Sequence, residues 1–293
     1  MTRGGPAELA EVATVVHRLA VLLAAGVAPA SAWGHAAVDS PSARRIAAGE
    51  PIEAQGSSDL QRDAWRGLAA AWAVATEAGS PLAPALRDYA VSLRELGEAQ
   101  RDARVALAGP VASARLVMVL PAVGILFGLA LGFDTVGTLL GTPLGWGCLG
   151  VGGGLMLVAW RWNARLVRAA RPPSATPGLA CELMAIGMAG GTSLDRARAI
   201  VDDALRRFGI AAESGEVESV LELSRRAGVP AAELLHSEAG ELRAAARASA
   251  QERAAALSVR LMLPLGLCVL PSFIALGVVP MLATVVTSTI GSF

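Results

Sequence analysis

Three long stretches of this chain contain no charged residue, and they constrain its fold more than any other feature. The stretches run over residues 116–133, 135–160 and 261–293. A helix that spans the hydrocarbon core of a bilayer needs roughly 17–25 predominantly apolar residues. Buried helices of globular proteins seldom extend this far without a charge. The sequence therefore predicts three transmembrane helices, at 115–134, 142–160 and 261–284.

The composition favours a membrane protein and argues against nucleic-acid binding. Hydrophobic residues make up 54 % of the chain and charged residues 17 %, with a mean hydropathy of +0.51. Soluble domains are typically about 45–50 % apolar and about 25 % charged. The 25 basic and 25 acidic residues give a net charge of zero, so the sequence indicates no basic surface for a phosphate backbone.

The placement of arginine predicts the orientation in the membrane. Four Arg residues lie at 161–171, directly after the second stretch, whereas the loop at 135–141 and the tail at 285–293 contain none. Cytoplasmic loops carry an excess of positively charged residues. We therefore expect residues 1–114 and 161–260 to be cytoplasmic. The loop, the tail and the C-terminus would then be external, in a multi-pass membrane protein.

Both predicted cytoplasmic parts have the pattern of helical bundles. In residues 1–114 and 179–260, apolar residues recur at three- and four-residue steps, and no alternation of period two is present. The Arg- and Pro-rich segment 161–178 joins them as a linker. We expect the main helices at 12–25, 60–78, 82–108, 179–189, 194–208, 216–227 and 231–257.

Glycines mark the turns of four predicted helical hairpins. Gly26, Gly79, Gly191 and Gly228 are each followed by Pro or by Thr-Ser within a few residues. Glycine adopts the left-handed conformation that ends a helix, and Pro or a hydroxyl residue begins the next one. The two bundles show the same order of hairpin, hairpin, long helix and charge-free stretch. The sequence thus predicts an all-α integral membrane protein with two duplicated cytoplasmic hairpin bundles and three transmembrane helices.

Glycines at four-residue spacing recur within the charge-free stretches. Small residues at this spacing let two helix backbones approach closely in a membrane. We expect a helix–helix seam, within the chain or between copies. The candidate packing residues are Gly124, Gly128, Gly132, Gly150 and Gly154.

The sequence predicts no enzymatic chemistry. No ionisable residue lies inside the charge-free stretches, where transporters and intramembrane proteases carry such groups. His17, His35 and His236 fall on predicted helix surfaces, and the three cysteines lie in separate segments without metal-ligand spacing. We therefore expect no catalytic residue, no metal and no cofactor.

Two sets of charged residues are candidate partner contacts. Arginines in the long helices that precede the first and third stretches could dock an acidic partner or could anchor the chain at lipid headgroups. An acidic patch at the start of the helix 216–227 could contact a partner, or could be a solvated helix start that suits the helix dipole. The residues are Arg94, Arg101, Arg104, Arg243, Arg247, Arg253, Glu213 and Glu216.

These motifs resemble a known family. The LLxAG step followed by a new helix, as in the segment 22–30, resembles the type II secretion system F-domain family. The segment Gly228–Leu282 is especially similar to inner-membrane platform proteins of Tad/Flp pilus assembly. The resemblance covers nearly the whole chain, although residues 39–59 depart from the pattern.

The resemblance implies a scaffold rather than an enzyme. Members of the family couple a cytoplasmic hexameric secretion ATPase to the assembly of pilin-like subunits at the base of a pilus or secretion machine. It also implies a location in a bacterial inner membrane. The implied partners are the lipid bilayer, a paralogous platform protein, and further copies in homo- or hetero-oligomers. The alternative that the residues leave open is an oligomeric channel or transporter for small solutes.

Overall fold

The computed structural model describes residues 5–130, 137, 140–169, 176–211, 214–260, 262–280, 282 and 286. All regular structure within these residues is helical, which confirms the all-α prediction. The chain divides into two compact units. The first unit contains Met1–Asp102 and Pro172–Ser249, and the second contains Ala103–Arg171 and Ala250–Phe293.

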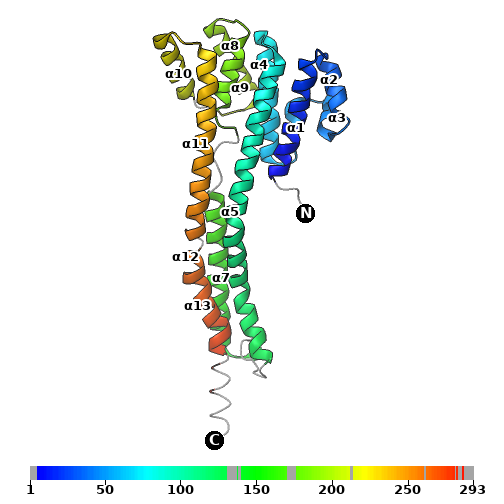
Figure 1. Cartoon of the computed structure of the whole chain (residues 1–293). Coiled ribbons are helices and arrows are strands. Elements are labelled where there is room, and N and C mark those ends of the chain that lie inside the picture. The colour runs from blue at the N-terminus through cyan, green and yellow to red at the C-terminus, as the bar shows by residue number, and fades with distance from the viewer. Residues whose placement is uncertain are drawn as a thin grey trace. The chain divides into compact units, whose positions relative to one another are not determined.

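The first unit consists of short helices and the initial parts of two long ones (Figure 1). Its elements are α1 (Gly5–Ala24), α2 (Pro29–Ala36), α3 (Pro41–Ala47), the 3-10 turn η1 (Ile52–Ala54), α4 (Asp59–Ala78), the start of α5 (Leu82–Ala130), α8 (Leu179–Ala189), α9 (Leu194–Phe208), α10 (Ser214–Ala227) and the start of α11 (Ala231–Arg260).

The predicted hairpin turns are confirmed by the backbone conformation. Gly26, Gly79, Gly191 and Gly228 have φ values of 86°, 70°, 74° and 66°, the left-handed region that only glycine adopts without strain. Ser193 then caps α9, because its hydroxyl oxygen accepts a hydrogen bond from the Arg196 backbone N–H at 3.4 Å. Local residue chemistry therefore sets where these helices end and begin.

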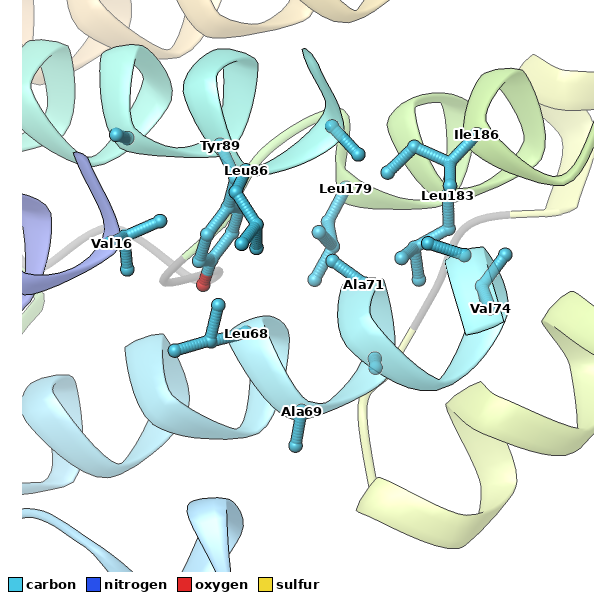
Figure 2. Packing of buried hydrophobic residues seen from close by; sticks show 14 of the residues in the cluster. Val16, Leu68, Ala69, Ala71, Val74, Leu86, Tyr89, Leu179, Leu183 and Ile186 are labelled. Carbon is cyan, nitrogen blue, oxygen red and sulfur yellow. The ribbon is translucent and has the colours of Figure 1, made fainter. Parts of the chain in front are cut away.

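The two predicted bundles are in fact one body with one hydrophobic core. α4, from the first half of the chain, packs against both α8 and α9 from the second half. Figure 2 shows Ala71 and Val74 of α4 beside Leu179 and Leu183 of α8. The physical reason is that α8 is apolar on nearly all sides, and such a helix must be enclosed by its neighbours. The hairpins of the second half alone do not enclose it.

Close backbone contacts join the two halves. A Cβ atom on Gly190 would lie 2.1 Å from the Ala78 carbonyl oxygen, so the end of α8 reaches the end of α4 only because residue 190 has no side chain. The Ser80 hydroxyl, which is buried, donates a hydrogen bond to the Ile186 carbonyl oxygen. Tyr89 makes a similar link within the first half, where its hydroxyl donates to the Ala64 carbonyl oxygen at 2.6 Å.

The second unit is built around a pair of helical segments. It contains the end of α5, α7 (Pro143–Ala169), the end of α11, α12 (Met262–Pro264), the π-helical turn η2 (Leu265–Val269), α13 (Leu270–Phe273) and the π-helical turn η3 (Ile274–Val278). α7 packs against η2, α13 and η3. The prolines at 264 and 271 border η2, and each lacks the N–H that an α-helix would use.

Gly152, rather than Gly150 or Gly154, forms the seam in the second unit. A Cβ atom on Gly152 would lie 2.4 Å from Leu276 Cγ, and the buried Ser272 hydroxyl donates to the Gly152 carbonyl oxygen at 2.8 Å. Open space adjoins Gly150 and Gly154, and both are exposed. Residues two positions apart on a helix face nearly opposite directions, so these two glycines face away from Leu276. Their predicted role in a seam between copies stays a prediction.

The remaining predicted seam residues fall outside what the structure describes. Gly124 and Gly128 belong to α5, but their surroundings are not among the described features, and Gly132 lies in the segment 131–136, outside the described residues.

Among the described residues, one helix is long and apolar enough to cross a membrane, and it spans Ala231–Val278. In the most apolar 18-residue segment of this helix, 38 % is buried. Most of that apolar surface is therefore not packed against the described residues. This finding supports membrane association. The other two spans and the orientation stay predictions.

Candidate functional site

The candidate site is centred on a buried carboxylate group. Glu182 is the one acidic residue of the apolar helix α8, and its side chain is only 3 % exposed. Removing a carboxylate from water costs several kcal/mol unless it is paired and hydrogen-bonded. The position of Glu182 therefore requires partners on the neighbouring helices.

α11 supplies two of these partners. His236 Nδ1 lies 3.2 Å from one carboxylate oxygen of Glu182, and Arg243 Nη1 donates to the other oxygen, also at 3.2 Å. His236 and Arg243 are two helical turns apart, so both side chains project from the same face of α11. Each oxygen of the buried carboxylate thus has a partner of its own.

α5 adds two further acids. Glu95 lies 3.5 Å from Arg243 Nε and 3.7 Å from Arg247 Nη2. The contact to Arg243 Nε is an ion pair by distance only, because that nitrogen has no hydrogen-bond partner. Asp88, two turns before Glu95, has a carboxylate oxygen within 4.8 Å of ligand atoms on Glu182 and His236. We call these six residues, Asp88, Glu95, Glu182, His236, Arg243 and Arg247, the Glu182 network.

The electrostatics of the Glu182 network favour charged side chains. Burial raises the pKa of Glu182, but the hydrogen bond and charge of His236, together with Arg243, outweigh burial, so its pKa lies below the ordinary value. The hydrogen bond to Glu182 raises the pKa of His236 against burial, which lowers it. Burial, followed by the charge of Glu182, raises the pKa of Asp88.

A metal ion is a possible occupant by residue type alone. Asp88, Glu182 and His236 are three ligand types that transition metals use, and their ligand atoms lie within 4.8 Å of one another. However, Arg243 already places a positive charge on Glu182, and a metal would displace the hydrogen bond between His236 and Glu182. The residues fit an ion-pair network better than a metal centre.

The structure places two of the predicted partner arginines in this network. Arg243 is 19 % exposed and Arg247 36 %, and both pair with acids of the same chain. Arg94 and Arg101 are exposed on α5 in the first unit. In the second unit, Arg104 is exposed and Arg253 is half-buried.

Of the two predicted acidic contact residues, the structure describes Glu216 but not Glu213. Glu216 is half-buried in the first turn of α10, where an acid suits the helix dipole. Glu213 lies outside the described residues.

The sequence predicts neither acid on α5 nor the roles of Glu182 and His236. Two signals could have indicated them. Glu182 is an isolated acid in the apolar segment Leu179–Ala189, and the acids of α5 and the bases of α11 repeat at matching two-turn spacing, with Asp88 and Glu95 facing His236 and Arg243. Only the three-dimensional fold shows that the acids of α5 lie against the basic residues of α11.

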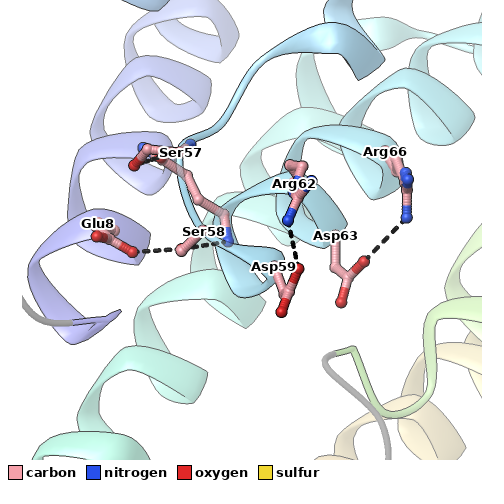
Figure 3. A network of polar contacts seen from close by, with 8 residues as sticks. Glu8, Ser57, Ser58, Asp59, Arg62, Asp63 and Arg66 are labelled. Carbon is pink, nitrogen blue, oxygen red and sulfur yellow. Dashed lines mark hydrogen bonds and ion pairs between the residues drawn. The ribbon is translucent and has the colours of Figure 1, made fainter.

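A second polar cluster has a structural role. Ser58 caps α4 by accepting a hydrogen bond from the Gln61 backbone N–H at 3.2 Å, and its hydroxyl donates to the Glu8 carboxylate of α1 (Figure 3). Two neighbouring ion pairs lie within single turns of α4. The pair of Arg62 with Asp59 is exposed, and the pair of Arg66 with Asp63 is half-buried. Such pairs contribute little to stability, so this cluster serves as a helix start.

Comparison with known proteins does not identify the chain. No protein-family model, no curated protein and no solved structure matches it.

Proposed function

We propose that this protein is an inner-membrane platform of a Tad/Flp-type pilus or a type II-like secretion machine. In this role it couples a cytoplasmic hexameric ATPase to the assembly of pilin-like subunits and performs no chemistry itself. The observation that carries the proposal is the repeated order of helices, in which each half has two glycine-terminated hairpins followed by one long helix.

The backbone supports this repeated order. In the first half, α1 and α4 end next to Gly26 and Gly79, and α5 follows. In the second half, α8 and α10 end next to Gly191 and Gly228, and α11 follows. A duplicated, chemically inert helical body is what a scaffold requires, because its function lies in presenting surfaces.

The faces of α7 support a membrane position for the second predicted span. Trp146 and Trp160, near the two ends of its charge-free part, are 65 % and 59 % exposed. Tryptophan is enriched at both membrane–water interfaces. Arg161 and Arg165 follow Trp160 directly and suit the cytoplasmic side of a bilayer.

The partner surface that fits an ATPase best is on α5. Arg94 and Arg101 project from the first unit, are exposed, and have no ion-pair partner among the described residues. They share one face because they are two helical turns apart. An acidic surface on the ATPase would complement them.

Native extraction tests the proposal. A tagged full-length chain is extracted from its own cells with mild detergent and crosslinking, and co-purified proteins are identified by mass spectrometry. We expect a hexameric secretion ATPase and a paralogous platform protein in the wild type. We expect loss of the ATPase in the double variant Arg94→Glu, Arg101→Glu.

A matched control distinguishes this surface from charge reversal in general. The double variant Arg206→Glu, Arg207→Glu on exposed positions of α9 should retain the ATPase. Recovery of homo-oligomers alone, with no ATPase after crosslinking, would contradict the platform function and favour the channel or transporter.

A further inference from the structure

The charges of the Glu182 network balance only when His236 carries a proton. The carboxylates of Glu95 and Glu182 pair with the guanidinium groups of Arg243 and Arg247. A third carboxylate, that of Asp88, lies within 4.8 Å of ligand atoms of Glu182 and His236. Arg87 lies next to Asp88 but is exposed, and it forms no ion pair with the network among the described residues. Two ion-paired positive charges against three negative charges therefore leave one negative charge without a partner. A protonated imidazole at His236, 3.2 Å from Glu182, supplies it.

The network lies where three helices meet. Glu182 belongs to α8, the acids Asp88 and Glu95 belong to α5, and the basic residues belong to α11. α5 and α11 are the two long helices that follow the last hairpin of each half. The contacts of Glu95 with Arg243 and Arg247 therefore connect one half of the chain to the other.

We propose that the Glu182 network is a proton-operated clamp that fastens α11 to α5 and α8. With His236 protonated, every charge of the network has an opposite partner, and α11 is held on both neighbours. When His236 loses that proton, the three negative charges face only the two positive charges of the arginines. The start of α11 then separates from α5 and α8 more often. The clamp concerns the helices of the first unit, so it stands whether or not the platform function is correct.

The charged groups around His236 determine the direction of the pH effect. They are Arg87, Asp88 and Glu95 from α5, Glu182 from α8, and Arg243 and Arg247 from α11. Because the pKa of His236 is raised by folding, the stabilisation is complete below its ordinary pKa of 6.5. It is lost as the pH rises through the raised value.

One variant should abolish the pH dependence of the clamp, and a second should weaken it. His236→Asn keeps a side-chain N–H near Glu182 but cannot gain a charge, so its clamp should be weak at every pH. Asp88→Asn removes one carboxylate and balances the network without the proton, so its clamp should stay closed at high pH. His35→Asn, on an exposed position of α2, is the matched control.

The test uses the full-length chain in detergent micelles with a chelator present. Hydrogen exchange of peptides covering 231–249 is measured from pH 5.5 to pH 8.5 and corrected for the intrinsic rate with an unfolded reference peptide. In the wild type and in His35→Asn, the opening of this segment should increase several-fold as the pH rises above about 6.5. His236→Asn should give a flat, open profile. Asp88→Asn should give a shallower rise than the wild type and stay more closed at high pH, because His236 keeps its hydrogen bond to Glu182.

An independent titration keeps the proposal testable if one variant folds poorly. The chain has only three histidines, so side-chain labelling of His gives a small set of NMR signals. His236 is assigned by its loss in His236→Asn or, by exclusion, from the signals lost in His17→Asn and His35→Asn. The pKa of His236 should fall in Asp88→Asn relative to the wild type. Equal pKa values, or equal pH profiles of exchange in wild type and Asp88→Asn, would overturn the clamp.

Discussion

The first unit encloses its large apolar side chains in one core, whereas the second unit leaves many of its own exposed. Leu68 and Leu183 are fully buried in the first unit, while Leu126 and Leu267 of the second are 67 % and 69 % exposed. Most of the exposed large apolar side chains belong to the second unit. Soluble surfaces rarely present contiguous apolar area on this scale. The difference indicates that the two units are built for different surroundings.

The polar contacts of the two units also differ, because those of the first unit are charged and the described one of the second is neutral. The first unit places a charged network around buried Glu182, which presupposes nearby water for the exposed ends of Arg247 and His236. In the second unit, the described link between α7 and α13 is one neutral hydrogen bond, from Ser272 to Gly152. Neutral hydrogen bonds and close packing at glycine are how helices associate in lipid.

The largest effect is expected from breaking the Glu182 network. Arg243→Met leaves Glu182 buried with one partner fewer, and the free energy of unfolding of the first unit should fall by about 3–5 kcal/mol. Arg94→Met, at an exposed position on α5, should change it by less than about 0.5 kcal/mol. Denaturant unfolding in micelles, followed by fluorescence, measures both. Equal stability of the two variants would show that the network does not hold the first unit together.

The next effect contrasts two leucines. Leu68→Ala opens a cavity in the shared core and should destabilise the first unit by about 2–5 kcal/mol. Leu267→Ala removes an exposed side chain and should leave the unfolding of the first unit unchanged. If Leu267→Ala destabilised the first unit as much as Leu68→Ala does in the same micelles, the contrast between an enclosed and an exposed apolar surface would be wrong.

A smaller effect separates the glycines of α7. Gly152→Ala places a methyl group against Leu276, so we expect a loss of about 1–3 kcal/mol in the stability of the second unit. Gly150→Ala meets open space and should instead stabilise the helix by about 0.5–1 kcal/mol. Thermal unfolding in micelles distinguishes the two, and a lower melting temperature for Gly150→Ala than for Gly152→Ala would contradict the seam.

The smallest effect is expected at the interhelical hydrogen bond. Ser272→Ala removes the donor to the Gly152 carbonyl oxygen, and such bonds contribute on average about 0.6 kcal/mol in membrane proteins. The melting temperature should fall slightly, and by less than in Gly152→Ala. A larger fall than in Gly152→Ala would mean that the hydrogen bond, rather than close backbone packing, holds α7 to α13.

Local features of the fold were accessible from the sequence, and long-range ones were not. The ends of α4 and α9 follow from Gly79, Ser193 and Gly209, because caps depend on neighbours within one turn. Which helices share a core depends on contacts across the chain, so the union of α4 with α8 was not predictable from periodicity.

The candidate site follows the same rule. His236 and Arg243 form a visible stripe on α11, but their meaning depends on Glu182, which is distant in sequence and on another helix. The seam glycine was missed for a related reason. Four-residue spacing selects Gly150 and Gly154 as a pair, yet spacing carries no information on which face of α7 meets a neighbour, and that face contains Gly152.

Cysteine labelling in spheroplasts tests the central claim, a membrane platform with its helical body in the cytoplasm. The native cysteines are replaced by Ala, and single cysteines are introduced by Ser57→Cys in the first unit and Ser292→Cys near the C-terminus. We predict that a membrane-impermeant maleimide labels Ser292→Cys in intact spheroplasts and labels Ser57→Cys only after lysis. Labelling of both before lysis, or recovery of the chain in the soluble fraction, would contradict the account.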